Sequence, residues 1–146
     1  MDITSRTHIA AAPDKVWQTV IDLRKMIDDI PAVLAVEPAD FAAVQGQKLS
    51  IRANVSGREV EVPATLTTVT PPAKLVVDAD LPDPVGAPAV AAMTLTPAGA
   101  GTDVQLTVTL KLGMLKEMAA KAMIGGRGQS ALDDALAQLK QRVEGS

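Results

Sequence analysis

The chain has 146 residues, 47% of them hydrophobic, which fits one domain with a core of its own. Its formal net charge is −3 and acidic and basic residues are interspersed, so no basic stripe is available for a nucleic-acid backbone and we expect no nucleic-acid partner. The absence of cysteine excludes disulfides and thiolate metal sites, and it fits a reducing compartment.

A strand followed by a helix is predicted at the N-terminus. Residues 2–11 read as a strand with Ile3 and Ile9 on one side. Pro13 and Asp14 then suit the first turn of a helix, because the missing N–H of proline costs nothing there and an acidic side chain favours the positive end of the helix dipole. The apolar stripe of this helix consists of Val16, Trp17, Val20 and Ile21.

A second short helix and a further strand are predicted before the main sheet. The helix would follow Asp22, a capping residue, and would end at Pro31. Its inward side chains would be Leu23, Met26, Ile27 and Ile30. Residues 33–40 are expected to form the next strand.

The middle of the chain changes to a period of two, which is typical of strands with one buried face. Residues 48–55 alternate apolar and polar side chains, and the alternation resumes after a turn at Ser56-Gly57. Val69 falls on the opposite parity to Leu66, so we expect a bulge near residues 67–68. A pair of prolines then ends this strand.

Three more strands complete the predicted sheet. Residues 75–79 mark one strand, and a proline-rich connection, residues 81–88, leads to the next. Residues 91–95 and 104–110 flank a turn with the sequence PAGAG, and the second of these segments has the cleanest alternation in the chain.

The last third of the chain returns to helical spacing. Its apolar positions are Leu115, Met118, Ala122, Leu132, Ala135, Leu136, Leu139 and Val143. Three glycines between residues 125 and 128 would each weaken a helix by about 1 kcal/mol. We therefore predict an α+β fold, in which two short helices after strand 1 and a long C-terminal helix cover one face of a seven-stranded antiparallel curved sheet and enclose a cavity.

This sequence resembles the helix-grip proteins of the SRPBCC / START-like (Bet v 1-type) superfamily, which includes polyketide cyclases, dehydrases and lipid-transport proteins. The resemblance rests on APDKVWQTVIDLRKM after the first strand, where Asp14, Val16 and Trp17 match the family's opening turn, and on the order of the elements. IPAV, residues 30–33, is similar to a stretch of the carbon monoxide dehydrogenase-related branch of this superfamily, with Ala32 where that branch has glycine. The resemblance implies a single helix-grip domain over residues 1–146, with Trp17 as a wedge between the short helices and the sheet.

Strand parity predicts which polar side chains avoid the cavity. The outward set is Arg52, Asn54, Glu59, Glu61, Asp78, Asp80, Asp103 and Gln105. His8, the only histidine, is also expected to face solvent, with a role as a ligand or acid–base group as the alternative. Ser5 and Thr7 share the inward parity, and we expect their hydroxyls to bond backbone carbonyls. We predict no catalytic residue, no metal site and no cofactor, because neither a serine–histidine–acid set nor clustered metal ligands can be assembled.

The remaining interior is aliphatic and contains methionines, whose flexible thioethers suit a greasy ligand of variable shape. The predicted ligand-binding residues are Leu49, Ile51, Val62, Leu66, Val77, Met93, Leu106, Val108, Met114, Met118 and Ala122. We expect a non-catalytic protein that binds or transports a hydrophobic small molecule, which the resemblance implies is a lipid, an isoprenoid or a quinone-like compound. The alternatives are an accessory protein that recruits a redox enzyme to the membrane and a polyketide cyclase/dehydrase-like enzyme.

A cytoplasmic location is expected from two further features. The N-terminal residues are polar and charged, unlike a secretory signal. The most apolar stretch, about residues 85–93, is too short and too interrupted by proline to span a bilayer.

Overall fold

A computed structural model describes residues 2–22, 33–37, 44–55, 57–81, 87–111, 129–130 and 132–145. The strands are β1 (Asp2–Ile9), β2 (Val33–Glu37), β3 (Lys48–Val55), β4 (Arg58–Thr70), β5 (Lys74–Leu81), β6 (Ala87–Ala98) and β7 (Gly101–Leu110). Helix α1 (Pro13–Val20) follows β1, and the described part of the C-terminal helix comprises residues 129–130 and 132–144.

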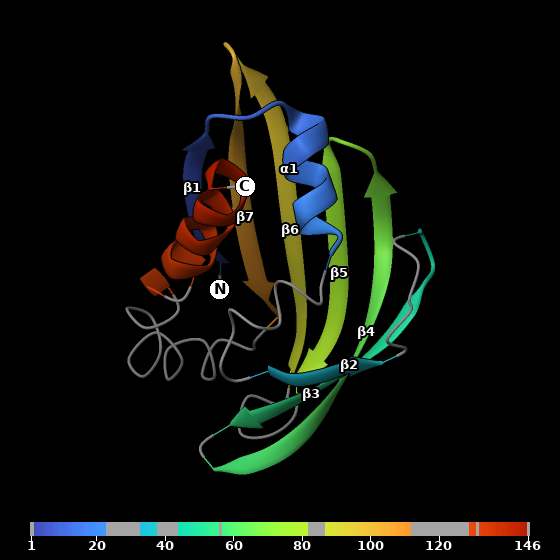
Figure 1. Ribbon diagram of the computed structural model, residues 1–146. Helices are drawn as coiled ribbons and strands as arrows, with labels where there is room; N and C mark the ends of the chain where they lie inside the picture. The colour runs from blue at the N-terminus through green and yellow to red at the C-terminus, as the bar shows by residue number, and fades with distance from the viewer. Residues whose placement is uncertain are drawn as a thin grey trace.

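The strands form one antiparallel sheet in the order β1-β7-β6-β5-β4-β3-β2. Strands β2 to β7 form a meander in which each strand pairs with the next, and β1 pairs with β7 at the edge of the sheet. Helix α1 and the C-terminal helix lie on the same side of the sheet, and the sheet curves around them (Figure 1). The predicted α+β architecture of a curved, seven-stranded antiparallel sheet covered by helices is confirmed.

Helix α1 begins as the sequence predicts. Ala12 is extended, Pro13 occupies the first turn and Asp14 lies beside it, without any side-chain cap. The helix buries Val16, Trp17 and Val20 toward the sheet.

The predicted bulge in β4 is present. The pairing of β4 with β5 shifts register between Leu66 and Thr68, so Thr67 is the extra residue. Because of this shift, Leu66 and Val69 both reach the helix-covered face although their parity in the sequence differs.

Several predicted boundaries need correction. Strand β1 ends at Ile9 rather than at residue 11, because the N–H of Ala11 turns back to the carbonyl oxygen of Ile9 at 2.8 Å. The connection predicted over residues 81–88 is shorter, since Leu81 belongs to β5, and residues 87–88 belong to β6 and pair with the end of β5. The second short helix, the end of the predicted strand at residues 38–40, the turn residue Ser56 and the glycine segment at 125–128 lie outside the described residues.

Two apolar clusters occupy the helix-covered face. The larger one, the helix core, joins α1 and the C-terminal helix to β1, β6 and β7 through Ile9, Val16, Trp17, Val20, Met93, Leu95, Val104, Leu136, Leu139 and Val143. Trp17 is 6% exposed within this cluster, so it packs between α1 and the sheet, whereas its predicted contact with the second short helix stays a prediction. The second, the sheet cluster, consists of Leu49, Ala64 and Leu66, with partly buried neighbours on β2 to β5.

Candidate functional site

The concave face of the sheet carries apolar side chains in rows that run across the strands. Cross-strand pairing aligns Leu66 with Val77, Val77 with Ala91, Ala91 with Val108, and Val108 with Ile3. Directly paired residues of an antiparallel sheet lie side by side on one face. Leu66 is buried, whereas the other four residues of this row are only half-buried. We call these five residues the apolar row.

The apolar row lies beside the helix core and ends in the sheet cluster. In the next row toward the helix core, Met93 belongs to that core and its pairing partner Leu106 packs against it. Leu66, at the β4 end of the apolar row, is itself a member of the sheet cluster, and Val77 is one of the partly buried neighbours of that cluster. From β4 to β7 the two clusters are therefore joined by apolar side chains, whereas the inward face of β1 also carries the buried Ser5.

The structure divides the predicted ligand-binding residues into groups. Leu49, Ile51, Leu66 and Val77 come together in or against the sheet cluster, and Val62 is buried on β4. Met93 and Leu106 belong to the region around the helix core, and Val108 lies in the apolar row. Met114, Met118 and Ala122 lie outside the described residues. Which of these side chains touch a ligand stays a prediction.

A polar clasp joins the C-terminal helix to β1 on the same face. The hydroxyl of Ser5, which is 5% exposed, donates to Oδ1 of Asp133, and Nε2 of Gln129 donates to the same oxygen at 3.0 Å. Gln129 Nε2 also donates to the backbone carbonyl oxygen of Thr4 at 2.9 Å. The hydrogen bond from Ser5, and then that from Gln129, holds the pKa of Asp133 below its ordinary value of 3.8.

The clasp corrects one expectation and adds a residue that the sequence reasoning missed. Ser5 is inward, as parity predicts, but its hydroxyl bonds a carboxylate instead of a backbone carbonyl. Asp133 is exposed, and the apolar pattern of the C-terminal helix does not include it. It lies one turn after Gln129 and one turn before the buried Leu136, so the three side chains share one side of the helix. This spacing is the signal in the sequence that could have predicted its contact with the sheet.

A second polar contact fixes the other end of the C-terminal helix. Oε2 of Glu144 accepts a hydrogen bond from the backbone N–H of Ala10 at 2.9 Å. Between the two contacts, Leu136, Leu139 and Val143 are almost fully buried against the core. This part of the helix is thus attached to β1 at one end and to Ala10, the residue after β1, at the other, and it forms one wall of the apolar face.

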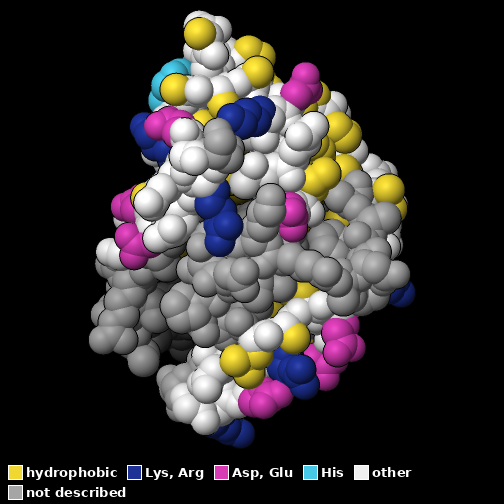
Figure 2. Space-filling view, in the orientation of Figure 1, with side chains coloured by type: hydrophobic (Ala, Val, Ile, Leu, Met, Phe, Trp, Pro, Cys, Tyr) yellow, Lys and Arg dark blue, Asp and Glu magenta, His cyan; other side chains and the backbone are white. Residues whose placement is uncertain are grey.

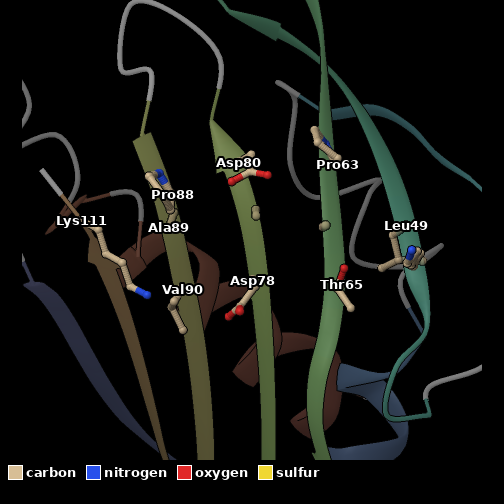
Figure 3. A pocket seen from close by; sticks show the side chains of 12 residues that line it. Leu49, Pro63, Thr65, Asp78, Asp80, Pro88, Ala89, Val90 and Lys111 are labelled. Atoms are coloured by element: carbon tan, nitrogen blue, oxygen red, sulfur yellow. The ribbon is translucent and has the colours of Figure 1, made fainter.

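The convex face of the sheet is polar, as parity predicts. All of the predicted outward side chains are exposed except Gln105, which is half-buried, and His8 is 53% exposed. On the opposite, helix-covered side, which Figure 2 shows, acidic and basic side chains are interspersed among hydrophobic ones. A convex groove of about 500 Å³ crosses β3 to β6 and reaches Lys111 just after β7, and Figure 3 shows Asp78, Asp80 and Lys111 among its lining side chains. Its charged lining does not suit a hydrophobic ligand, because burying charged groups against an apolar molecule is costly.

Two negative findings apply to the described residues. No group of three histidine, aspartate or glutamate side chains among them could hold a metal ion. None of their helices is both long enough and apolar enough to cross a membrane.

Comparison with known proteins places this geometry in a family. The model of the family "Polyketide cyclase / dehydrase and lipid transport" matches residues 1–144. The chain belongs to this family. The match covers the strands, both described helices and the clasp, and it agrees with the resemblance seen in the sequence. No curated protein sequence matches the chain significantly.

Solved structures share the fold of this polyketide cyclase / dehydrase and lipid transport domain. TTHA0849 from Thermus thermophilus superposes with a TM-score of 0.71 at 19% identity, over 99% of this chain and 98% of the other. MLL2253 from Mesorhizobium loti gives 0.76 at 17% identity, over 100% and 98%. Ara h 8.0201 gives 0.71 at 12% identity, over 100% and 99%. At these identities the likeness establishes the fold alone, which is the Bet v 1-like helix-grip fold.

Proposed function

We propose that this protein binds a hydrophobic small molecule, such as a lipid, an isoprenoid or a quinone-like compound, against the concave face of its sheet. The observation that carries the proposal is the apolar row, four of whose five residues are only half-buried although they face the helix side. When an apolar ligand covers these half-buried side chains, their remaining surface is removed from water, and this burial makes the free energy of binding more favourable. The family description, which includes lipid transport, agrees with this class of ligand.

The proposed binding is non-catalytic. Asp133 accepts a hydrogen bond from the inward Ser5 of β1 and another from Gln129, and both hydrogen bonds favour its ionised form. A carboxylate with a lowered pKa is a poor proton donor at neutral pH, and its contacts hold a helix in place. The clasp therefore acts as a structural support of the ligand-binding face.

The test uses one bulky substitution on each face of β6. Ala91→Phe places a ring within the apolar row and should weaken the binding of a hydrophobic probe, such as a fluorescent fatty acid, by about fivefold or more, because overpacking by a large side chain costs about 1–3 kcal/mol. Ala92→Phe places the same ring on the convex face and should leave the affinity unchanged. Native mass spectrometry of freshly purified protein would identify a ligand that remains bound.

Two results would contradict this proposal. One is the failure of the wild-type protein to bind any hydrophobic probe. The other is an equal loss of affinity in Ala91→Phe and Ala92→Phe, which would mean that the ligand contacts neither face specifically.

The two alternatives give different outcomes. A cyclase- or dehydrase-like enzyme that uses the clasp should lose turnover of a polyketide-like substrate when Ser5 is replaced by alanine, whereas a carrier should keep its ligand. An accessory protein should sediment with lipid vesicles without extracting lipid from them. Among the described residues the exposed large hydrophobic side chains are Leu34 and Val44, and two such positions do not by themselves establish a docking patch.

A further inference from the structure

A second groove on the convex face, separate from the proposed ligand face, has the chemistry of an anion site. Its volume is about 600 Å³ and it crosses β1, β7 and β6. Its lining consists of Val104 on the apolar side and, as polar residues, Thr7 together with Arg6, His8, Thr94, Thr96, Asp103 and Gln105, whose side chains have outward parity. Cross-strand pairing arranges these outward residues in two rows, one running from Arg6 through Gln105 to Thr94 and the other from His8 through Asp103 to Thr96.

The imidazole of His8 has a fixed position in this groove. Its Nδ1 is 2.8 Å from Oδ1 of Asp103, and because an ionised carboxylate only accepts hydrogen bonds, Nδ1 carries the proton. The ring also lies over Gly101, where a Cβ atom would come within 2.7 Å of Nε2. A glycine at residue 101 therefore provides the space in which the imidazole lies.

The guanidinium of Arg6 is oriented by a neutral partner. Its Nε donates to Oε1 of Gln105 at 2.9 Å. In the described part of the chain no carboxylate oxygen lies within ion-pair distance of Arg6, whereas Arg52 on the same face pairs with Glu59 at 3.3 Å. The charge of Arg6 is thus presented to the groove without a counter-ion from the described residues.

We propose that this groove binds a small oxyanion, a phosphate or carboxylate group, through the terminal nitrogens of Arg6. The hydroxyls of Thr94 and Thr96 and the imidazole of His8 line the same groove as further polar partners. A guanidinium forms charge-assisted hydrogen bonds with either group, and its planar fork fits two oxygens of one anion. Asp103 is the acidic side chain of this lining. Its carboxylate would repel an anion, but one of its oxygens is hydrogen-bonded to His8.

The experiment is an NMR titration of the ¹⁵N-labelled full chain at constant ionic strength. Inorganic phosphate is added in one series and acetate in another, and sodium chloride serves as the reference. We expect saturable shifts of the amide signals of Arg6, His8, Thr94 and Thr96 with at least one of the two anions. Arg6→Gln should weaken that binding by about tenfold or more, because a charge-assisted hydrogen bond is lost.

Arg52→Gln is the matched control, since it removes the same charge from an exposed position on the same face. It should leave the affinity unchanged. Thr94→Val, which keeps the shape and removes a hydroxyl, should weaken binding by a smaller factor than Arg6→Gln. The proposal is overturned if neither anion gives saturable shifts beyond those of chloride, or if Arg52→Gln reduces the affinity as much as Arg6→Gln.

Discussion

Replacing Gly101 with alanine should destabilise the fold at a site that no apolar pattern marks. A Cβ atom at residue 101 would lie 2.5 Å from the backbone oxygen of Ile9 and 2.7 Å from Nε2 of His8. Ordinary van der Waals contact begins at 3.4 Å, so the oxygen would have to move by about 0.9 Å. Ile9 is fully buried and its pairing partner Thr102 bonds the carbonyl of Ala11 at 2.7 Å, so this backbone has little freedom to move.

Overpacking of this kind costs about 1–3 kcal/mol, which for a domain of this size lowers the melting temperature by about 2–12 °C. Urea unfolding, followed by circular dichroism and by the fluorescence of Trp17, measures the change in the free energy of unfolding. Gly99→Ala is the matched control: its Cβ would meet no atom within 4 Å, and it carries only the backbone cost of a positive φ of 63°. That cost is about 1 kcal/mol.

A second variant separates the two clashes. His8→Ala in the Gly101→Ala background removes the contact with the ring but leaves the contact with the Ile9 oxygen. We expect the double variant to recover only part of the lost stability. The reasoning is refuted if Gly101→Ala unfolds at the same urea concentration as the wild type, or if His8→Ala restores the stability completely.

Two further predictions concern the helices. Trp17→Ala should lower the free energy of unfolding by about 3–5 kcal/mol, because it leaves a cavity in the helix core. Thermal unfolding followed by circular dichroism measures this loss. A loss below about 1 kcal/mol would show that the ring is not packed in the helix core. Asp133→Asn tests the clasp through pH. Because the pKa of Asp133 is lowered by Ser5 and Gln129, the ionised clasp stabilises the fold above the ordinary pKa of aspartate, and this contribution is lost as the pH falls through the lowered value. The difference in unfolding free energy between the wild type and the variant should therefore stay constant near neutral pH and shrink below about pH 4, where a constant difference would contradict the assignment.

Most of the fold followed from local rules in the sequence. The period of two placed β3, β5 and the turn before β7, and a single break in parity between Leu66 and Val69 predicted the bulge in β4. The same parity placed Asp103 and His8 on the convex face and Ser5 on the concave face. These predictions succeed because the alternation of side chains along a strand is set by the backbone of that strand and needs no information from elsewhere.

What only the tertiary structure decided are the contacts between distant parts of the chain. The bond between Ser5 and Asp133, the position of the His8 ring over Gly101 and the division of the apolar side chains into the helix core and the sheet cluster all depend on which elements become neighbours. Parity assigns each side chain to a face, but the register between strands and the attachment of the C-terminal helix decide its partner along that face. The sequence by itself therefore determined the family, the sheet and the apolar character of its inner face, whereas packing determined which apolar positions close the core and which stay half-buried.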